Sequence, residues 1–177
     1  IREPYQYEKK IKKACFIGML YDIRLEMSKI LNKHPLFEIY GIHDGYRGLN
    51  YYEKMNSHAL TLSFNGNGEW CIRDVESIGL GIPIVRSLMK TEFYGGLIPG
   101  LDYIQGSVAS DTAHYSYPRY GPKDIAEQYI DAVENVIGNE ELLTNISKRN
   151  IEYYDNNLRI PKIIEKFFTI FDINILK

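Results

Sequence analysis

Residues 14–42, ACFIGMLYDIRLEMSKILNKHPLFEIYGI, hold the pattern of a strand, a helix and a second strand in close succession. Residues 14–19 are short, apolar and bounded by charge, as in a strand buried on both faces. Apolar side chains then recur at helical spacing through residues 22–33, with Asp22 expected as the N-cap. Residues 37–42 form the next strand. A strand, a helix and a strand within about 30 residues predict a right-handed parallel crossover unit.

The same alternation continues through the rest of the chain. Three further strands are predicted, at residues 59–64, 82–85 and 101–104. Helices are predicted at residues 51–56, 73–80, 122–138, 140–154 and 161–171. Together these elements predict an α/β fold with a three-layer, Rossmann-like open parallel sheet and a helical C-terminal tail. We expect residues 1–13 to be an N-terminal lead, residues 14–156 the sheet domain and residues 157–177 the C-terminal helix.

Composition and charge limit the possible functions. The chain has 177 residues, of which 45% are hydrophobic and 25% charged, as in one globular domain. Its net charge of -2 provides no strong field that would attract nucleic acid. The longest apolar stretch is far shorter than the roughly 18 residues of a membrane-spanning helix, so the protein is not expected to be transmembrane.

The cysteines and histidines indicate the compartment and the absence of a metal site. Cys15 and Cys71 are too far apart for a short chelating motif, and no histidine pair has chelating spacing, so we predict no metal site. Two free thiols are typical of a reducing compartment, and we expect a cytoplasmic protein. The chain begins at Ile1 rather than Met, so we expect it to be cut from something longer or to be processed.

The loop after the third predicted strand carries the strongest chemical signal. Residues 65–76 are NGNGEWCIRDVE, and ligands of open parallel sheets bind beyond the carboxyl ends of strands, next to helix N-termini. Gly66 and Gly68 allow a phosphate to approach the backbone closely, and Arg73 offers a forked, permanently charged donor. Glu76, one helical turn later, is placed to accept hydrogen bonds from vicinal sugar hydroxyls.

A plainer interpretation of this loop stays open. The Asn-Gly-Asn-Gly sequence is then only a turn, and Arg73 pairs with Glu69, Asp74 or Glu76 on a solvated helix face. A single glycine-rich loop is weak evidence for a phosphate site. Two other phosphate motifs are excluded more firmly, because the first strand ends with Gly18 alone and no Gly-x4-Gly-Lys-Ser/Thr loop occurs. Dinucleotide-dependent oxidoreductases and P-loop NTPases are therefore poor candidates.

Residues 57–85, SHALTLSFNGNGEWCIRDVESIGLGIPIV, resemble the donor-sugar-binding half of the two-Rossmann-domain (GT-B) glycosyltransferases, most closely the exostosin-like enzymes. In that pattern a strand and a small polar loop precede a Ser-x-Arg-x-x-Glu-like helix and a Gly-x-Pro-Val turn. Cys71 stands in the place of the usual serine. By this resemblance Arg73 matches the basic residue on the diphosphate, and Glu76 matches the glutamate that binds the ribose.

The resemblance implies a domain that binds a nucleoside-diphosphate sugar and helps to transfer a hexose-type sugar to a glycan or another acceptor. It implies no metal ion and no separate cofactor, a catalytic role for Arg73, and a second Rossmann-like domain that carries the acceptor site. We therefore expect this chain alone to bind the donor and to turn over poorly. The expected donor-binding residues are Gly18, His43, Asn65, Gly66, Asn67, Gly68, Glu69, Trp70, Arg73, Asp74 and Glu76.

Two other functions stay open. One is a noncatalytic, flavodoxin-like protein-interaction module whose apolar C-terminal helix docks a partner. The other is a sugar-nucleotide epimerase of the same two-domain architecture, which needs catalytic carboxylates that the sequence does not single out. Replacement of Arg73 and Glu76 by alanine discriminates between a donor-binding site and an ion pair on the helix surface. Only the loss of a donor-binding site lowers the affinity for a nucleotide.

Overall fold

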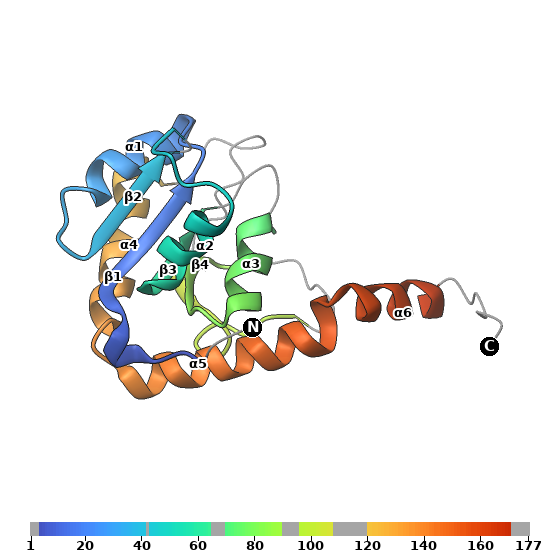
Figure 1. Cartoon of the computed structure of the whole chain (residues 1–177). Helices are drawn as coiled ribbons and strands as arrows, with labels where there is room; N and C mark the ends of the chain where they lie inside the picture. Colours follow the sequence, from blue (N-terminus) through green and yellow to red (C-terminus); the bar gives the residue numbers. More distant parts are fainter. Residues whose placement is uncertain (1–3, 42, 65–69, 90–95, 108–119, 171–177) are drawn as a thin grey trace.

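The computed structural model describes residues 4–41, 43–64, 70–89, 96–107 and 120–170. Five parallel strands form one open sheet in the order β2-β1-β3-β4-β5 (Figure 1). The strands are β1 (Ile11–Gly18), β2 (Phe37–Gly41), β3 (His58–Ser63), β4 (Ile84–Ser87) and β5 (Ile104–Ser107). The α-helices are α1 (Asp22–Leu31), α2 (Leu49–Asn56), α3 (Ile72–Leu80), α4 (Pro122–Val136), α5 (Glu140–Tyr153) and α6 (Ile160–Ile170). The predicted α/β class and the open parallel sheet are confirmed.

Helices cover both faces of the sheet. α1 and α4 pack together on one face, while α2 and α3 cover the other and α5 packs on α3 (Figure 1). Successive side chains of β1 alternate between the two cores, with Ala14 and Phe16 on the side of α1 and α4 and with Cys15 and Ile17 on the side of α2. β1, an interior strand, is thus buried on both faces over residues 14–17, which explains its continuous apolar sequence.

Several predicted boundaries differ from the structure; the fourth strand, for example, is β4 at Ile84–Ser87 rather than residues 82–85. β1 begins at Ile11 instead of residue 14, because the Ile11 N–H bonds to Ser57 O at 2.8 Å before the apolar run starts. The fifth strand is β5 rather than residues 101–104, since Leu101 lies in an exposed turn. The N-cap of α1 is Tyr21, and Asp22, with φ of 46°, is the first residue of the helix.

The first described residues are fastened to distant parts of the fold. The Tyr5 hydroxyl donates to Ala59 O at 2.9 Å, next to the start of β3. The Tyr7 hydroxyl donates to Ile137 O at 2.6 Å, just after the end of α4. The N-terminal lead is therefore packed onto the domain from Tyr5 onward.

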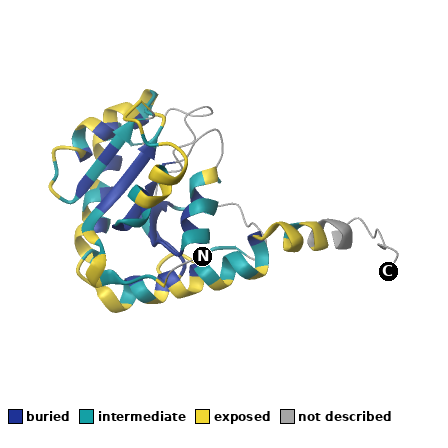
Figure 2. Ribbon diagram, in the orientation of Figure 1, coloured by how far each residue is buried: buried dark blue, intermediate teal, exposed yellow. Residues whose placement is uncertain are grey.

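The C-terminal part leaves the sheet domain. A π-helical turn (Tyr154–Leu158) follows α5, and α6 then projects away from the sheet (Figure 1). Ile160 and Ile164 on α6 are 72% and 47% exposed, and Figure 2 shows the coloured first part of this helix as largely exposed. Among the described residues, no helix has both the length and the apolarity that crossing a bilayer requires.

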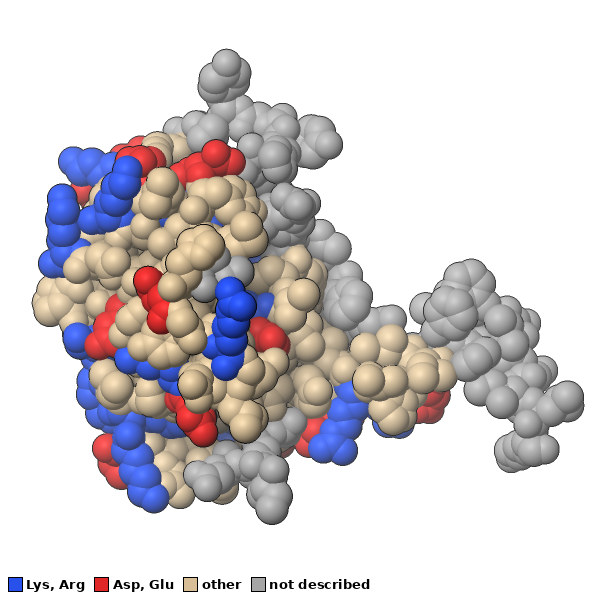
Figure 3. Space-filling model, turned by 45° about the horizontal axis from the view of Figure 1, so that its top comes forward, with Lys and Arg blue, Asp and Glu red and all other residues tan. Residues whose placement is uncertain are grey.

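Charges are intermixed on the surface. On the face seen in Figure 3, lysines and arginines lie among aspartates and glutamates instead of forming one continuous basic surface. This distribution agrees with the net charge of -2. The visible face thus has no extended single-sign field.

Glu38 on β2 is the centre of a polar cluster at the edge of the sheet. Its Oε2 accepts hydrogen bonds from the Tyr40 hydroxyl at 2.5 Å and Lys54 Nζ at 3.0 Å, and it lies 3.0 Å from Nε2 of the fully buried His58. Its Oε1 accepts from Lys13 Nζ at 3.1 Å. Burial acts to raise the pKa of Glu38, but these contacts outweigh it and hold the pKa well below its usual range.

We expect Glu38→Gln to flatten the acid side of the stability profile. Because the folded-state pKa of Glu38 lies below its unfolded value, its contribution is present above about pH 4.3 and is lost as the pH falls through the folded-state value. Chemical denaturation at a series of pH values below 5 measures the effect. Glu26→Gln, at an exposed pair with Lys29, is the control. Equal acid slopes for wild type and Glu38→Gln would contradict the prediction.

Candidate functional site

The sheet order changes direction between β1 and β3. The chain runs from β1 outward to β2 and then crosses back to β3, so the crevice between the carboxyl ends of β1 and β3 is the usual ligand position of such sheets. These ends are Gly18 and Ser63. A cavity of about 410 Å³ opens beside them. It is lined by Met19, Tyr21, Arg24, Trp70, Cys71, Ile72, Arg73 and Glu76.

Arg73, in the first turn of α3, reaches across to the end of β1. Its Nη2 donates a hydrogen bond to Ile17 O, and the guanidinium lies 4.2 Å from the centroid of the Phe16 ring. Gly18 makes room for it, since a β-carbon at this position would overlap Nη2 of Arg73. Among the described residues, the buried Nε of Arg73 has no hydrogen-bond partner. A guanidinium carries five N–H donors, and Arg73 lines the cavity.

Arg24, in the first turn of α1, places a second guanidinium on the cavity wall. It is only 8% exposed, and its Nη2 donates to Phe64 O at 2.8 Å while the group lies over the Tyr21 ring at 4.9 Å. Burial lowers the pKa of Arg24, and the charge of Arg73 acts in the same direction, but a guanidinium stays protonated. Two neighbouring cations favour an anionic ligand in the cavity. Arg24 was not among the expected donor contacts.

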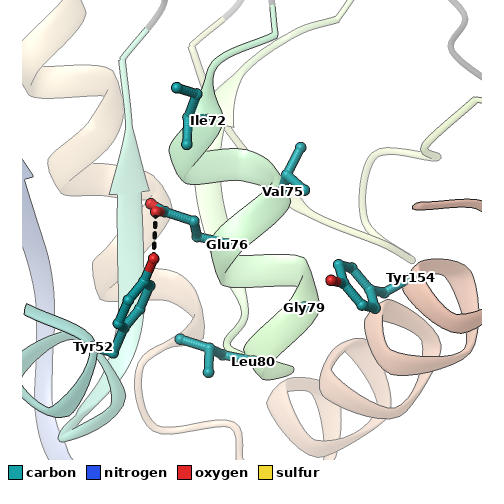
Figure 4. Close-up of a pocket in the computed structure, with 7 residues that line it drawn as sticks. All are labelled: Tyr52, Ile72, Val75, Glu76, Gly79, Leu80 and Tyr154. Carbon is teal, nitrogen blue, oxygen red and sulfur yellow. Dashed lines mark hydrogen bonds between the residues drawn. The ribbon is translucent and has the colours of Figure 1, made fainter. Parts of the chain in front are cut away.

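Glu76, one turn after Arg73, is held by two tyrosines of α2. Its Oε2 accepts from the Tyr51 hydroxyl at 2.7 Å, and its Oε1 accepts from the Tyr52 hydroxyl at 3.0 Å. Burial and the bond to Glu76 raise the pKa of Tyr51. The carboxylate lines the 410 Å³ cavity as well as a second one of about 280 Å³ (Figure 4).

Asp74 has a different environment from Arg73 and Glu76. It is fully buried, and its Oδ2 accepts from the Cys71 N–H at 2.8 Å and lies 2.7 Å from Nη1 of Arg86. These contacts fix the start of α3 and join it to β4. Asp74 does not line the cavity, so we assign it no donor contact.

The described contacts do not support the alternative in which Arg73 pairs with a neighbouring carboxylate on the helix surface. Asp74 faces Arg86, and Glu76 faces two tyrosine hydroxyls. Within the described ranges, neither carboxylate forms an ion pair with Arg73. The third acid considered, Glu69, lies outside the described residues.

Of the other expected donor-binding residues, some line the cavity and some do not. Trp70 lines the cavity and packs against the core residues beneath α3. His43 is exposed in the turn after β2 and does not line this cavity. The loop residues Asn65, Gly66, Asn67, Gly68 and Glu69 lie outside the described residues, so their expected roles stay predictions. In the part of the chain that the structure describes, no group of three His, Cys, Asp or Glu side chains is arranged to hold a metal ion.

Sequence reasoning missed Tyr51 and Tyr52. The place of Arg24 directly after the first strand indicates that it could approach a phosphate or a sugar, but Arg24 was not included among the expected donor-binding residues. No signal distinguished the two tyrosines, because the chain contains 15 of them. A search for matching protein families and curated proteins finds none. The functional argument therefore depends on the geometry of this cavity.

Proposed function

We propose that this chain binds a nucleoside-diphosphate sugar in the cavity at the ends of β1 and β3, as the donor-binding domain of a glycosyltransferase. The observation that carries the proposal is the pair of guanidiniums, Arg24 and Arg73, each held by a main-chain carbonyl at the end of a strand. Arginine forks suit the oxygens of a diphosphate, and these two are fixed before the ligand arrives. A volume of about 410 Å³ lies within the usual range of ligand sites.

The same residues suit the chemistry of sugar transfer. The bond between the anomeric carbon and the diphosphate oxygen breaks, and a bond to an acceptor oxygen forms. Negative charge develops on the departing diphosphate, and Arg24 and Arg73 stabilise it together with the N-terminus of α3. Glu76 accepts hydrogen bonds from the ribose hydroxyls. The proposal assigns the acceptor site and the removal of the acceptor proton to the second domain that the family resemblance implies.

Titration calorimetry with UDP, GDP, ADP and CMP tests the proposal. We expect one nucleotide to bind in the micromolar range and Arg73→Ala to weaken that binding by about 10- to 100-fold, the loss of one or two charge-assisted hydrogen bonds. Gly18→Ala is expected to weaken binding as well, because its methyl group displaces the Arg73 guanidinium while keeping its charge.

The control for these variants is Arg159→Ala, which removes an exposed guanidinium that pairs with Asp155. It is expected to leave nucleotide affinity unchanged. Circular dichroism confirms that each variant is folded. Absence of nucleotide binding to the folded wild-type chain would refute the proposal, and so would equal affinity in wild type and Arg73→Ala.

A second candidate is a noncatalytic interaction module. Two observations favour it: the strand order 2-1-3-4-5 also occurs in flavodoxin-like proteins, and α6 exposes the apolar Ile160 and Ile164. This function predicts that no nucleotide binds and that the Arg73→Ala chain behaves as wild type. The same titrations therefore separate the two candidates.

A further inference from the structure

We propose that Tyr51 and Tyr52 are positioning residues that aim the Glu76 carboxylate at the ribose diol of the donor, so that the site selects ribonucleotides over deoxyribonucleotides. The inference rests on the proposed function and names the part of the donor that α2 controls. Neither tyrosine touches the donor in this scheme. Both act through Glu76.

The geometry of Glu76 supports this role. Each of its oxygens accepts one tyrosine hydroxyl, at 2.7 Å from Tyr51 and at 3.0 Å from Tyr52. Because a carboxylate oxygen has two lone pairs, one acceptor position remains on each oxygen. The two oxygens belong to one carboxylate and are adjacent, and a vicinal diol offers two adjacent O–H donors. The two tyrosines thus leave one acceptor position on each oxygen of Glu76 for the two ribose hydroxyls.

The position of Glu76 also fits. It lines both the 410 Å³ cavity that contains the two arginines and the 280 Å³ cavity of Figure 4. In Figure 4 the Tyr52 side chain extends from α2 toward Glu76 on α3, so the carboxylate is held from a different helix. The rings of Tyr51 and Tyr52 pack edge to face, 5.0 Å apart, which restricts both hydroxyls. A carboxylate fixed in this way pays little entropy when it binds a diol.

Tyr51 has an additional effect that Tyr52 lacks. It is the more buried of the two, and the charge of Arg73 acts on its hydroxyl while the hydroxyl donates to Glu76. Tyr51 is therefore bonded to the carboxylate of the proposed ribose side and is also within the field of the Arg73 cation. Without its hydroxyl, Arg73 and Glu76 are free to pair with each other. We expect Tyr51→Phe to weaken both phosphate and ribose recognition, and Tyr52→Phe to weaken ribose recognition alone.

The test compares the nucleoside diphosphate that binds the wild-type chain with its 2′-deoxy analogue. We expect wild type to prefer the ribonucleotide by about 10-fold, the effect of one net hydrogen bond. Tyr52→Phe is expected to reduce this preference toward unity and to weaken the deoxynucleotide, which keeps its 3′-hydroxyl, less than the ribonucleotide. Tyr51→Phe is expected to reduce the preference and the affinity for both ligands. Glu76→Gln is expected to abolish the preference.

Tyr154→Phe is the matched control. Tyr154 lines the 280 Å³ cavity together with Tyr52 and Glu76, and its ring lies against Gly79 (Figure 4). It is expected to keep the wild-type preference. The ratio of the two affinities does not change when a variant merely loses stability, so the readout is specific to positioning. If nucleotides bind but Tyr51→Phe and Tyr52→Phe keep the full preference, the inference is wrong and the proposed function survives. If no nucleotide binds, both are wrong.

Discussion

Asp74→Ala is expected to lower the free energy of unfolding by about 3–5 kcal/mol, as other losses of one partner from a buried ion pair do. Asp74 and Arg86 are 0% and 1% exposed at the side chain, and their Oδ2 and Nη1 atoms lie 2.7 Å apart. Removal of the carboxylate leaves this buried guanidinium without the contact, and also removes the acceptor of the Cys71 N–H. Urea denaturation of wild type and variant measures the loss.

Asp124 provides the matched control for this prediction. Its carboxylate accepts the Gly121 N–H at 2.9 Å, as that of Asp74 accepts the Cys71 N–H, but Asp124 is exposed on α4. Asp124→Ala is expected to cost only the roughly 0.5–2 kcal/mol of a lost cap. Similar losses at the two positions would show that the ion pair with Arg86 contributes nothing. Replacement of Asp74 by Leu together with Arg86 by Met is expected to recover part of the loss, because no charge is then buried.

Tyr129→Ala is the other substitution with a large expected effect, a loss of about 3–5 kcal/mol. Tyr129 on α4 is fully buried, and its ring packs edge to face against Phe64 with centroids 5.3 Å apart. Gly106 on β5 lies directly against it, since a β-carbon there would be 2.7 Å from the ring. The loss of this ring opens a cavity between α4 and the sheet. Thermal or urea denaturation measures the cost.

Tyr129→Phe separates the ring from the hydroxyl. The hydroxyl donates to Ser63 O at 3.0 Å, at the carboxyl end of β3. We expect its removal to cost about 1 kcal/mol, plus a further penalty because a buried acceptor loses its donor. A cost as large as that of Tyr129→Ala would mean that the hydrogen bond, rather than the packing, holds α4 on the sheet.

The order of the elements could be predicted from local patterns. Strands buried on both faces are short apolar runs, and amphipathic helices repeat every 3.6 residues, so neither requires knowledge of distant contacts. The failures occurred where distant contacts decide. β5 contains Gly106, which a local pattern assigns to a loop, but the Tyr129 side chain occupies the space that a β-carbon would need. Ile11 belongs to β1 because Ser57 supplies its hydrogen bond.

The candidate site was harder to predict than the fold. Arg73 and Glu76 were expected at this edge of the sheet, and both line the cavity there, while their roles in donor binding stay predictions. Asp74 lies between them in the sequence, yet it faces the core, because one turn of helix points side chains in all directions. Its partner Arg86 lies in a four-residue strand that is buried throughout. No local pattern indicates that a buried arginine on one element matches a buried aspartate on another.

The hydrogen bond that holds the N-terminal lead on the domain has a consequence for folding during translation. β1 precedes the other four strands in the described sequence, yet it lies inside the sheet and pairs with β2 on one side and β3 on the other. The Tyr7 hydroxyl bonds to a carbonyl 130 residues later in the chain, at Ile137. On a nascent chain this bond cannot form until Ile137, just after α4, has been synthesised and has left the exit tunnel. The lead around Tyr7 therefore reaches its native position only after α4, which is translated much later, has folded.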